Sequence, residues 1–240
     1  MNTIPMKTKV LSTLAILFLL GFVSISHGQQ KTTDPLRFSA GVLTGYNRGF
    51  GMHTNITAHN FAPGFPFELR LGMGYTLLNP GNAADARRIF INNATNGTPE
   101  KKGSSFDFRL DFMLSRSFFG AGRSYLVLGP RFSTFKGDFK YIGGNEDFEV
   151  KSKQWGIGAG LENHFRMTSN LSLILAVGLD HYFPSTLTGH DTSYSPDNDN
   201  VNPQDDNQDD DTPFTYRDAD KAIRQPMFMP RAMIGVSFGL

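Results

Sequence analysis

Serine, histidine and aspartate side chains that could do nucleophilic chemistry lie close together in one part of the chain. Asp180, His181, Ser185 and His190 fall just before or within the long segment 184–226. A hydrolase of this type needs a nucleophile, a base and an acid that meet in space. Sequence neighbours do not by themselves form such a set, and no motif frames Ser185 as a nucleophile. We therefore predict no catalytic residues, and hydrolysis stays an alternative.

An aspartate-rich segment is a second candidate for chemistry. Residues 191–211 contain eight aspartates and no Lys or Arg. Calcium prefers several carboxylate and carbonyl ligands, and residues 197–199 begin like an EF-hand loop. However, Val201 and Asn202 stand where that loop needs an oxygen ligand and a glycine. We therefore predict that this segment is a solvated, disordered acidic loop and that the chain has no metal site or cofactor. Weak calcium binding by residues 191–211 is the alternative.

Charged residues of both signs occupy one face of segments that alternate between polar and apolar residues. Carboxylates and arginines nearly balance on this face, and lysine does not occur in the set. Buried charges must be paired, and the planar guanidinium suits bidentate pairing with a carboxylate. We predict a structural network of ion pairs that plugs the interior. Its members are Glu68, Arg70, Asp107, Arg109, Asp111, Arg131, Glu162, Asp180 and Arg231.

The elements that position these charges are strands. In 67–77, Phe, Leu, Leu, Met, Tyr and Leu share one face, while Glu, Arg, Gly, Gly and Thr share the other. Alternation with period two indicates a β-strand with two unlike faces. The same pattern predicts eight strands, at 37–46, 50–59, 67–78, 105–115, 123–135, 149–165, 170–182 and 227–240.

The lengths of the connections predict how these strands are arranged. After a short first turn, short and long connections alternate along the chain. The short ones are 60–66, 116–122 and 166–169, and the long ones are 79–104, 136–148 and 184–226. Alternate connections of an antiparallel up-and-down sheet lie at the same end of the sheet. One end is therefore expected to have short turns and the other end long loops. Transmembrane β-barrels show this asymmetry.

Two of the long loops carry helix-start signals. Asn82 is expected to cap a helix over 83–91. Thr215 is expected to cap a second helix over 216–225, which ends before Pro226. The loop 79–104 is basic, so we expect it to attract the acidic loop at the same end, through contacts that salt screens.

The glycines of the charged face indicate which way the two faces point. A water-facing surface has no need of glycine, whereas a narrow barrel needs small residues where side chains converge. The last strand also alternates up to Leu240, which suits closure against the first strand. We therefore predict an all-β, eight-stranded antiparallel up-and-down transmembrane β-barrel with apolar side chains facing lipid. A soluble secreted lipocalin-like barrel, with those side chains inside, is the alternative.

The N-terminal residues predict export across a membrane. Lys7 and Lys9 precede an uncharged, mostly apolar run at 10–23, and small residues follow up to Gly28. This is the pattern of a cleaved signal peptide at residues 1–28, which leaves 29–240 as one barrel domain. The chain has no cysteine, which excludes disulfides, and its formal charge of +1 argues against nucleic-acid binding.

Strand number, loop asymmetry, signal peptide and the terminal strand at 229–240 together resemble one known family. The chain looks like the small eight-stranded outer-membrane β-barrels of bacteria with two membranes, the OmpA-barrel and OmpX-like group. The resemblance implies an outer-membrane location, outer-membrane lipid around the barrel and a non-enzymatic structural, adhesion or surface-interaction role, with a surface or envelope protein as partner. The enzyme alternative is then a lipid A hydrolase-like barrel.

Overall fold

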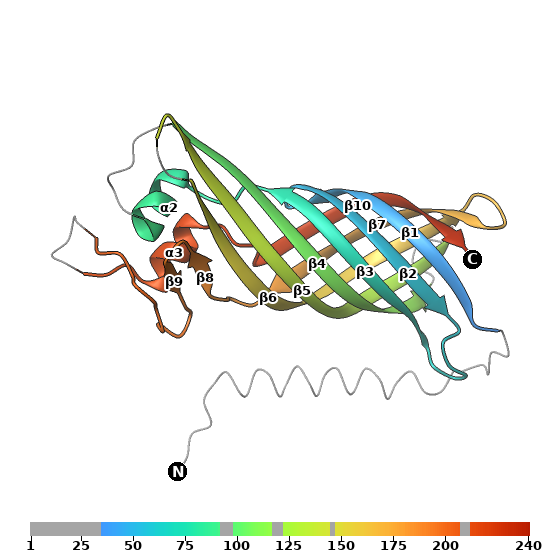
Figure 1. Cartoon of the computed structure of the whole chain (residues 1–240). Coiled ribbons are helices and arrows are strands. Elements are labelled where there is room, and N and C mark those ends of the chain that lie inside the picture. The colour runs from blue at the N-terminus through green and yellow to red at the C-terminus, as the bar shows by residue number, and fades with distance from the viewer. Residues whose placement is uncertain (1–34, 92–97, 117–121, 145–146, 207–211) are drawn as a thin grey trace, which may run out of the picture.

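The computed structural model describes residues 35–91, 98–116, 122–144, 147–206 and 212–240, and most of them form strands (Figure 1). The predicted signal peptide at 1–28 lies outside the described residues. The elements are β1 (Arg37–Asn47), β2 (Phe50–His59), β3 (Phe67–Leu78), α2 (Ala83–Phe90), β4 (Thr98–Arg116), β5 (Arg123–Ile142), β6 (Asp147–Arg166), β7 (Leu171–Tyr182), β8 (Leu187–Gly189), β9 (Thr192–Tyr194), α3 (Tyr216–Ala222) and β10 (Phe228–Gly239). Neither helix is long and apolar enough to cross a membrane.

Strands β1 to β7 and β10 close into a barrel. Every strand pairs antiparallel with its neighbours, and β5 pairs with both β4 and β6. The first and last strands complete the ring, with Val42 opposite Val236. Closure removes the sheet edges that would otherwise leave backbone groups without partners. The prediction of an eight-stranded antiparallel up-and-down barrel is confirmed.

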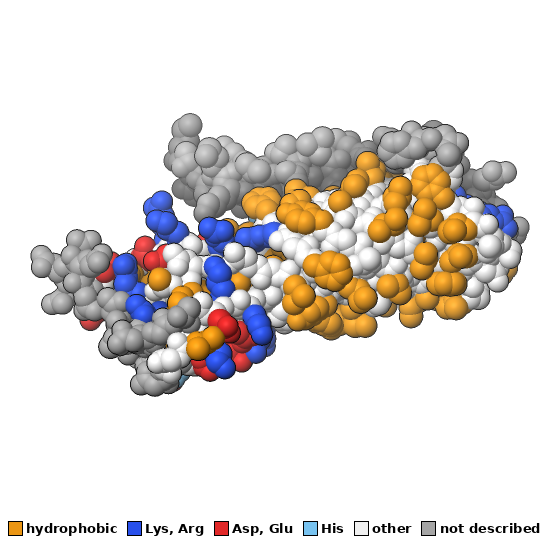
Figure 2. Space-filling model, turned by 90° about the horizontal axis from the view of Figure 1, so that it is seen from above, with side chains coloured by type: hydrophobic (Ala, Val, Ile, Leu, Met, Phe, Trp, Pro, Cys, Tyr) orange, Lys and Arg blue, Asp and Glu red, His pale blue; other side chains and the backbone are white. Residues whose placement is uncertain are grey.

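Apolar side chains cover the outside of the barrel. Leu71 is 66% exposed and Val177 55%, whereas Arg70 is 4% exposed and Asp180 is fully buried. Figure 2 shows hydrophobic side chains spread over one face of the barrel, while most of the charged side chains in this view lie at one end. A soluble lipocalin-like barrel would have the opposite arrangement, because its apolar faces would line the interior.

Three strands are longer than predicted. β4 begins at Thr98, β5 continues to Ile142 and β6 begins at Asp147. These strands therefore extend past Leu78, the last residue of β3. The expectation of a long connection at 136–148 is therefore wrong. The extension is stable because its inward-facing side chains, Phe139 and Phe148 among them, are buried under a folded cap.

The cap consists of α2, α3, β8, β9 and the upper parts of β5 and β6, and it lies at the opposite end of the barrel from the C-terminus (Figure 1). Two tyrosines tie α2 to it: the hydroxyl of Tyr141 donates to the carbonyl of Ala83 (2.6 Å), and that of Tyr194 to the carbonyl of Ile89 (2.7 Å). Its buried core is Ala83, Ala86, Ile89, Phe90, Phe135, Phe139, Tyr141, Phe148, Val150, Leu187, Tyr194, Phe214, Ala219, Ala222 and Ile223. The long loops thus form a small hydrophobic core of their own.

Both predicted helices form, and each begins where its cap residue predicts. The side chain of Asn82 accepts from the N–H of Ala84 (3.0 Å). The backbone N–H and hydroxyl of Thr215 both donate to Asp218 (2.9 and 2.6 Å). α3 ends at Ala222 rather than at residue 225, because the chain there turns to bridge the residues before α2: Ile223 pairs with Gly81.

The acidic segment is folded over its described residues, so the expectation of a disordered loop is wrong for 191–206. Ser193 and Val201 pair as a β-bridge, and the amide of Asn200 accepts from the N–H of Ser195 (3.0 Å). The expected attraction between the basic and acidic loops is represented by Arg88 and Asp206, whose side chains lie 3.6 Å apart.

Candidate functional site: a charge network in the barrel lumen

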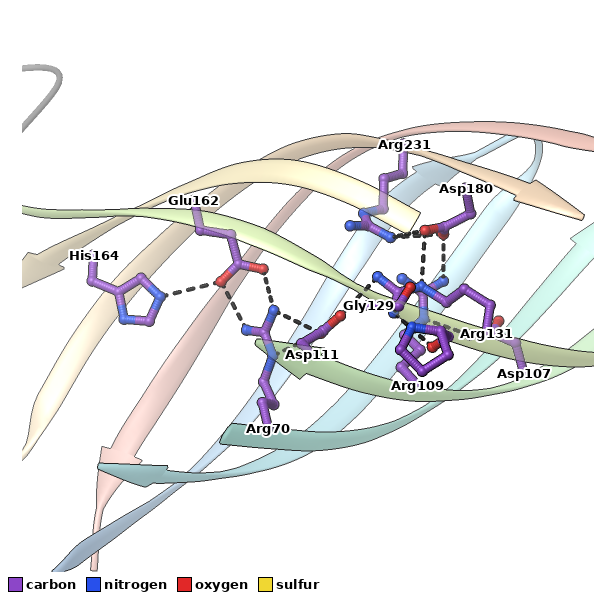
Figure 3. Close-up of polar contacts among 11 residues, drawn as sticks. Arg70, Asp107, Arg109, Asp111, Gly129, Arg131, Glu162, His164, Asp180 and Arg231 are labelled. Atoms are coloured by element: carbon purple, nitrogen blue, oxygen red, sulfur yellow. Dashed lines mark hydrogen bonds and ion pairs between the residues drawn. The ribbon is translucent and has the colours of Figure 1, made fainter. Parts of the chain in front are cut away.

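Asp180 of β7 is the centre of a cluster of charges in the barrel lumen (Figure 3). Arg231 of β10 donates from Nη1 to both of its carboxylate oxygens, at 2.6 Å each. Arg131 of β5 donates from Nε at 2.9 Å, and Nη2 of Arg109 of β4 lies 3.1 Å from Oδ2. Arg109 also pairs with Asp107. One carboxylate thus contacts arginines from three other strands across the lumen.

Arg70 of β3 forms the second centre. It holds Glu162 of β6 in a bidentate pair, with distances of 2.8 and 2.6 Å, and it donates from Nε to Asp111 at 3.1 Å. Asp111 also faces Nη2 of Arg131 at 2.7 Å. Because Arg131 also contacts Asp180, the two centres form one continuous network that includes β3, β4, β5, β6, β7 and β10.

The network is balanced in charge and hidden from solvent. It joins four arginines to four carboxylates, and each of these side chains is at most 6% exposed. Breaking such a buried pair costs more than the pair itself contributes, because the remaining charge is left without a partner. The arrangement therefore locks the strands together and has no free charge to offer a substrate.

Glycines make room for these large side chains. A Cβ on Gly158 would lie 2.0 Å from Oδ1 of Asp180 and 2.5 Å from Nε of Arg131. A Cβ on Gly178 would lie 2.9 Å from Nη2 of Arg231. Real Cβ atoms essentially never approach other atoms so closely, so the network as packed requires glycine at positions 158 and 178.

Glu68 is the one predicted member that lies apart. Its carboxylate is 2.8 Å from Nδ1 of His59 and accepts from the hydroxyl of Tyr125 at 3.3 Å. It sits near the start of β3, at the end of the barrel with the short turns, and its side chain is 19% exposed. The other eight predicted residues all belong to the network.

Sequence reasoning missed the uncharged polar residues that extend the network. His164 lies 3.3 Å from Glu162 at the short-turn end. At the cap end, Asn47 donates to Thr76 (2.8 Å) and lies 3.4 Å from His53. All these residues stand on the inner face of their strands, so their place in the alternation was the signal that could have identified them.

Apolar side chains fill much of the remaining lumen toward the short turns. Leu43, Ile174, Ala176 and Met233 form one buried cluster, and Met113, Tyr125 and Val127 form another. A cavity of about 20 Å³ remains beside Arg70, Arg109 and His53. That volume has room for about one water molecule, which is too little for a solute path.

The residues considered for nucleophilic chemistry are not brought together. Asp180 points into the lumen, whereas its strand neighbour His181 packs outside against Phe228, with ring centroids 4.6 Å apart. Ser185 donates its hydroxyl to the backbone of Lys153 at 2.5 Å, and His190 faces Asp191 at the surface. Adjacent residues of a strand face opposite sides, so Asp180 and His181 cannot act on one substrate.

Metal ligands do not cluster within the described ranges: nowhere in them do three His, Asp or Glu side chains gather closely enough to hold an ion. Residues 207–211 of the acidic segment lie outside those ranges. Weak calcium binding at 191–211 stays the alternative to the prediction of no metal site.

The comparisons with known proteins identify the fold. No family model and no curated protein matches the chain. A major outer membrane protein from Thermus thermophilus matches with a TM-score of 0.64 and 20% identity, over 86% of this chain and all 100% of that one. CarO and CarO2 of Acinetobacter baumannii match at 12% identity, over 88% and 86% of this chain and 100% of each, but their TM-scores of 0.40 and 0.37 are too low to carry an argument.

The chain is thus a closed eight-stranded β-barrel that shares its fold with a solved outer-membrane protein. At this level of identity the likeness concerns the fold alone. Membership of the OmpA-barrel and OmpX-like group stays a prediction.

Proposed function

We propose that this chain is a non-enzymatic β-barrel of the bacterial outer membrane whose lumen is closed by ion pairs. The observation that carries the proposal is the inversion of the usual soluble arrangement: apolar side chains face outward, and four arginines with four carboxylates are buried inside. Hydrocarbon is the solvent that favours such an exterior. The low-dielectric interior favours charges only when they are paired.

The closed lumen implies that the barrel does not act as a porin. An eight-stranded barrel has an interior that side chains can fill, and here the network of Arg70 and Asp180 crosses it. We expect the purified protein, inserted into a planar bilayer, to give no large, steady single-channel currents under conditions where a general porin conducts. Steady porin-like currents would overturn the plug.

Export and location follow from the same proposal. Residues 1–28 act as a signal peptide, so the mature protein begins at Gln29 and is recovered with the outer membrane. The signal-peptide pattern and the apolar barrel exterior support this. N-terminal sequencing of protein from an outer-membrane fraction tests both points, and recovery of soluble protein from the culture medium would contradict them.

The role we propose is structural, adhesive or surface-interacting, through the cap at the long-loop end. A packed core with Phe90, Phe148 and Tyr194 supports this role, because a rigid cap can present a defined surface to an envelope or surface protein. A deletion strain complemented with the intact chain tests it. We expect loss of detergent resistance or adhesion on deletion, whereas altered lipid A mass spectra would instead point to a lipid-modifying enzyme.

A further inference from the structure

An aromatic row marks one level on the outer face of β4, β5 and β6. Phe108, Phe132 and Trp155 stand next to one another on these three strands. The rings of Phe132 and Trp155 lie 5.0 Å apart, and Trp155 is 65% exposed. Aromatic residues gather at the boundary between hydrocarbon and headgroups in membrane barrels.

The length of β6 indicates that the aromatic row marks the boundary on the cap side of the barrel. The stretch 155–165 provides the roughly 9–11 residues that a tilted strand needs to cross the hydrocarbon core. Its outward residues are apolar from Trp155 to Leu161, and Phe165 stands at the other end. The next outward positions beyond Trp155 are Lys153 and Lys151, so their ammonium groups lie at the level of the headgroups on the cap side.

Lysines dominate the outer face at this level. Lys136 of β5 stands directly opposite Lys151 of β6, and Lys153 is two residues further along. Glu149 lies within 2.6 Å of Lys136 and 2.5 Å of Lys151, and Asp138 within 2.9 Å of Lys136. We call this group the basic patch; its members are Lys102, Lys136, Asp138, Glu149, Lys151 and Lys153.

The basic patch is not neutralised by the protein. Four ammonium groups face two carboxylates, which leaves a formal charge of +2. Within the ranges that the structure describes, neither Lys102 nor Lys153 forms an ion pair with a carboxylate. Like charges directly opposite on neighbouring strands are destabilising, and Glu149, which contacts both Lys136 and Lys151, offsets part of this repulsion. The remaining charge of +2 attracts a further anion.

The positive charge is concentrated in two neighbouring rows, that of Lys153 and that of Lys136 and Lys151. In the next row away from the barrel Asp138 stands between Lys102 and Glu149, and in the row after that Lys140 stands between Glu100 and Asp147, so the balance there is acidic. On the side of the hydrocarbon, the neighbouring row is the aromatic one that contains Trp155. Figure 2 shows the same change, from hydrophobic side chains over the barrel to charged side chains at its end. Positive charge at the depth of the headgroups is placed where lipid phosphates would lie.

We propose that the basic patch binds the phosphate of a phosphorylated lipid headgroup in the outer leaflet. The proposal rests on the proposed function, because it requires the barrel to span a membrane. Lys136, Lys151 and Lys153 supply ammonium groups, which bind phosphate as point charges, while Trp155 packs against the glycerol or sugar region below them. The patch occupies one side of the barrel only, so it holds the lipid at a defined place on the wall.

Trp155 is the only tryptophan of the chain, so its fluorescence reports on the lipids beside the patch. The protein is folded into phosphatidylcholine vesicles that contain either brominated phosphatidylglycerol or brominated phosphatidylcholine, because bromine quenches a nearby indole. A basic cluster attracts anionic headgroups. We therefore expect the quenching by brominated phosphatidylglycerol to exceed that by brominated phosphatidylcholine about twofold at low salt.

The variant Lys151→Gln/Lys153→Gln lowers the formal charge of the patch to zero, and it should bring the ratio of the two quenching efficiencies to about one. Lys221→Gln is the matched control, because Lys221 is an exposed lysine on α3 in the cap. It should keep the wild-type ratio. Each variant is compared with its own brominated phosphatidylcholine value, which corrects for direct effects on the indole.

The outcomes separate the two proposals. Equal quenching by both lipids in the wild type, or an unchanged ratio in the double variant, would overturn the phosphate site while leaving the membrane barrel intact. No quenching by either lipid would contradict the membrane barrel itself. Inorganic phosphate, added against chloride at equal ionic strength, should leave the ratio unchanged; loss of the ratio would show that the site prefers free phosphate and would overturn the lipid assignment.

Discussion

Arg131 donates from Nε to Oδ1 of Asp180 at 2.9 Å, and neither side chain has any exposed surface. Their strands, β5 and β7, are separated by β6, so the pair crosses the lumen rather than following a sheet ladder. Because Asp180 also faces Arg109 and Arg231, it is the carboxylate on which three cations converge. The stability of the barrel should therefore depend on this residue more than on any surface charge.

Asp180→Asn should strongly destabilise the barrel, because it leaves three buried guanidinium groups without their shared counter-charge. Loss of one partner of a buried pair costs about 3–5 kcal/mol. The measurement is the urea midpoint, read from the folded and unfolded bands on electrophoresis without boiling. Asp138→Asn is the control, since Asp138 is 43% exposed and should change the midpoint little.

A second substitution tests whether charge balance is the reason. Arg231→Gln in the Asp180→Asn background removes one of the uncompensated cations, so it should recover part of the lost stability. Contacting residues of one network are expected to be non-additive in this way. If the double variant lost as much stability as the two single variants together, the charge balance of the network would be contradicted.

Gly158→Ala tests the close packing around the same pair. The added Cβ would lie 2.0 Å from Asp180, and relieving such an overlap in a packed interior costs about 1–3 kcal/mol. Gly239→Ala is the matched control, because its Cβ would meet no atom closer than 3.9 Å. The same urea midpoints should fall for Gly158→Ala only, and equal midpoints would show that the lumen has free space there.

Phe90→Ala should loosen the cap and leave the barrel folded. Phe90 is 1% exposed and packs edge-on against Tyr194, with ring centroids 5.3 Å apart. Removing a buried phenyl ring costs about 3–5 kcal/mol. Trypsin should then cut the cap faster, whereas Val201→Ala, at a residue that is 53% exposed, should not change cleavage. A simultaneous loss of the folded, SDS-resistant barrel band on electrophoresis without boiling would contradict the independence of the two parts.

Asp218 should show a depressed pKa in the folded cap. Partial burial by itself would raise the pKa of Asp218, but the hydrogen bonds that Thr215 donates from its hydroxyl and its backbone N–H hold this pKa below the ordinary value for an aspartate. The carboxylate therefore stabilises the start of α3 above the ordinary Asp range, and this contribution is lost as the pH falls through the lowered pKa. An NMR titration in micelles measures the pKa; Thr215→Ala should raise it, and an unchanged value would contradict the capping contact.

The alternation of the eight strands and the lengths of their connections predicted the barrel, and the alternation placed most of the network residues on its inner face. Arg70 and Glu162 both stand on the polar face of their strands, and closure of the sheet is what brings them together. Glu68 stands on the same face but near the start of β3, where, among the described residues, its carboxylate contacts His59 and Tyr125 and not an arginine. Sequence gives the face of a residue, whereas its height in the barrel depends on tilt and register.

The cap was not predicted because the pattern of β5 changes phase. From Leu126 to Phe132 the outward-facing side chains are apolar, but from Phe135 to Tyr141 the aromatic side chains face inward while Lys136 and Lys140 face outward. Inside the barrel, the polar lumen gives way there to the apolar core of the cap. In the membrane barrel that we propose, hydrocarbon also gives way to water outside at this level. The shift in the phase of the alternation was therefore the signal of the folded cap, and in the proposed membrane barrel it also marks the membrane boundary.

The central claim is that the apolar outer face of the barrel meets lipid, and spin labels on β6 test it most directly. The chain has no cysteine, so single cysteines can replace outward residues without interference. In vesicles, labels at Ile157 and Ala159 should be relaxed mainly by oxygen, which concentrates in hydrocarbon. Labels at Lys151 and Lys153 should be relaxed mainly by a water-soluble nickel chelate. The switch from relaxation by oxygen to relaxation by the nickel chelate should occur near Trp155. Dominance of the nickel chelate at Ile157 and Ala159 would contradict the account.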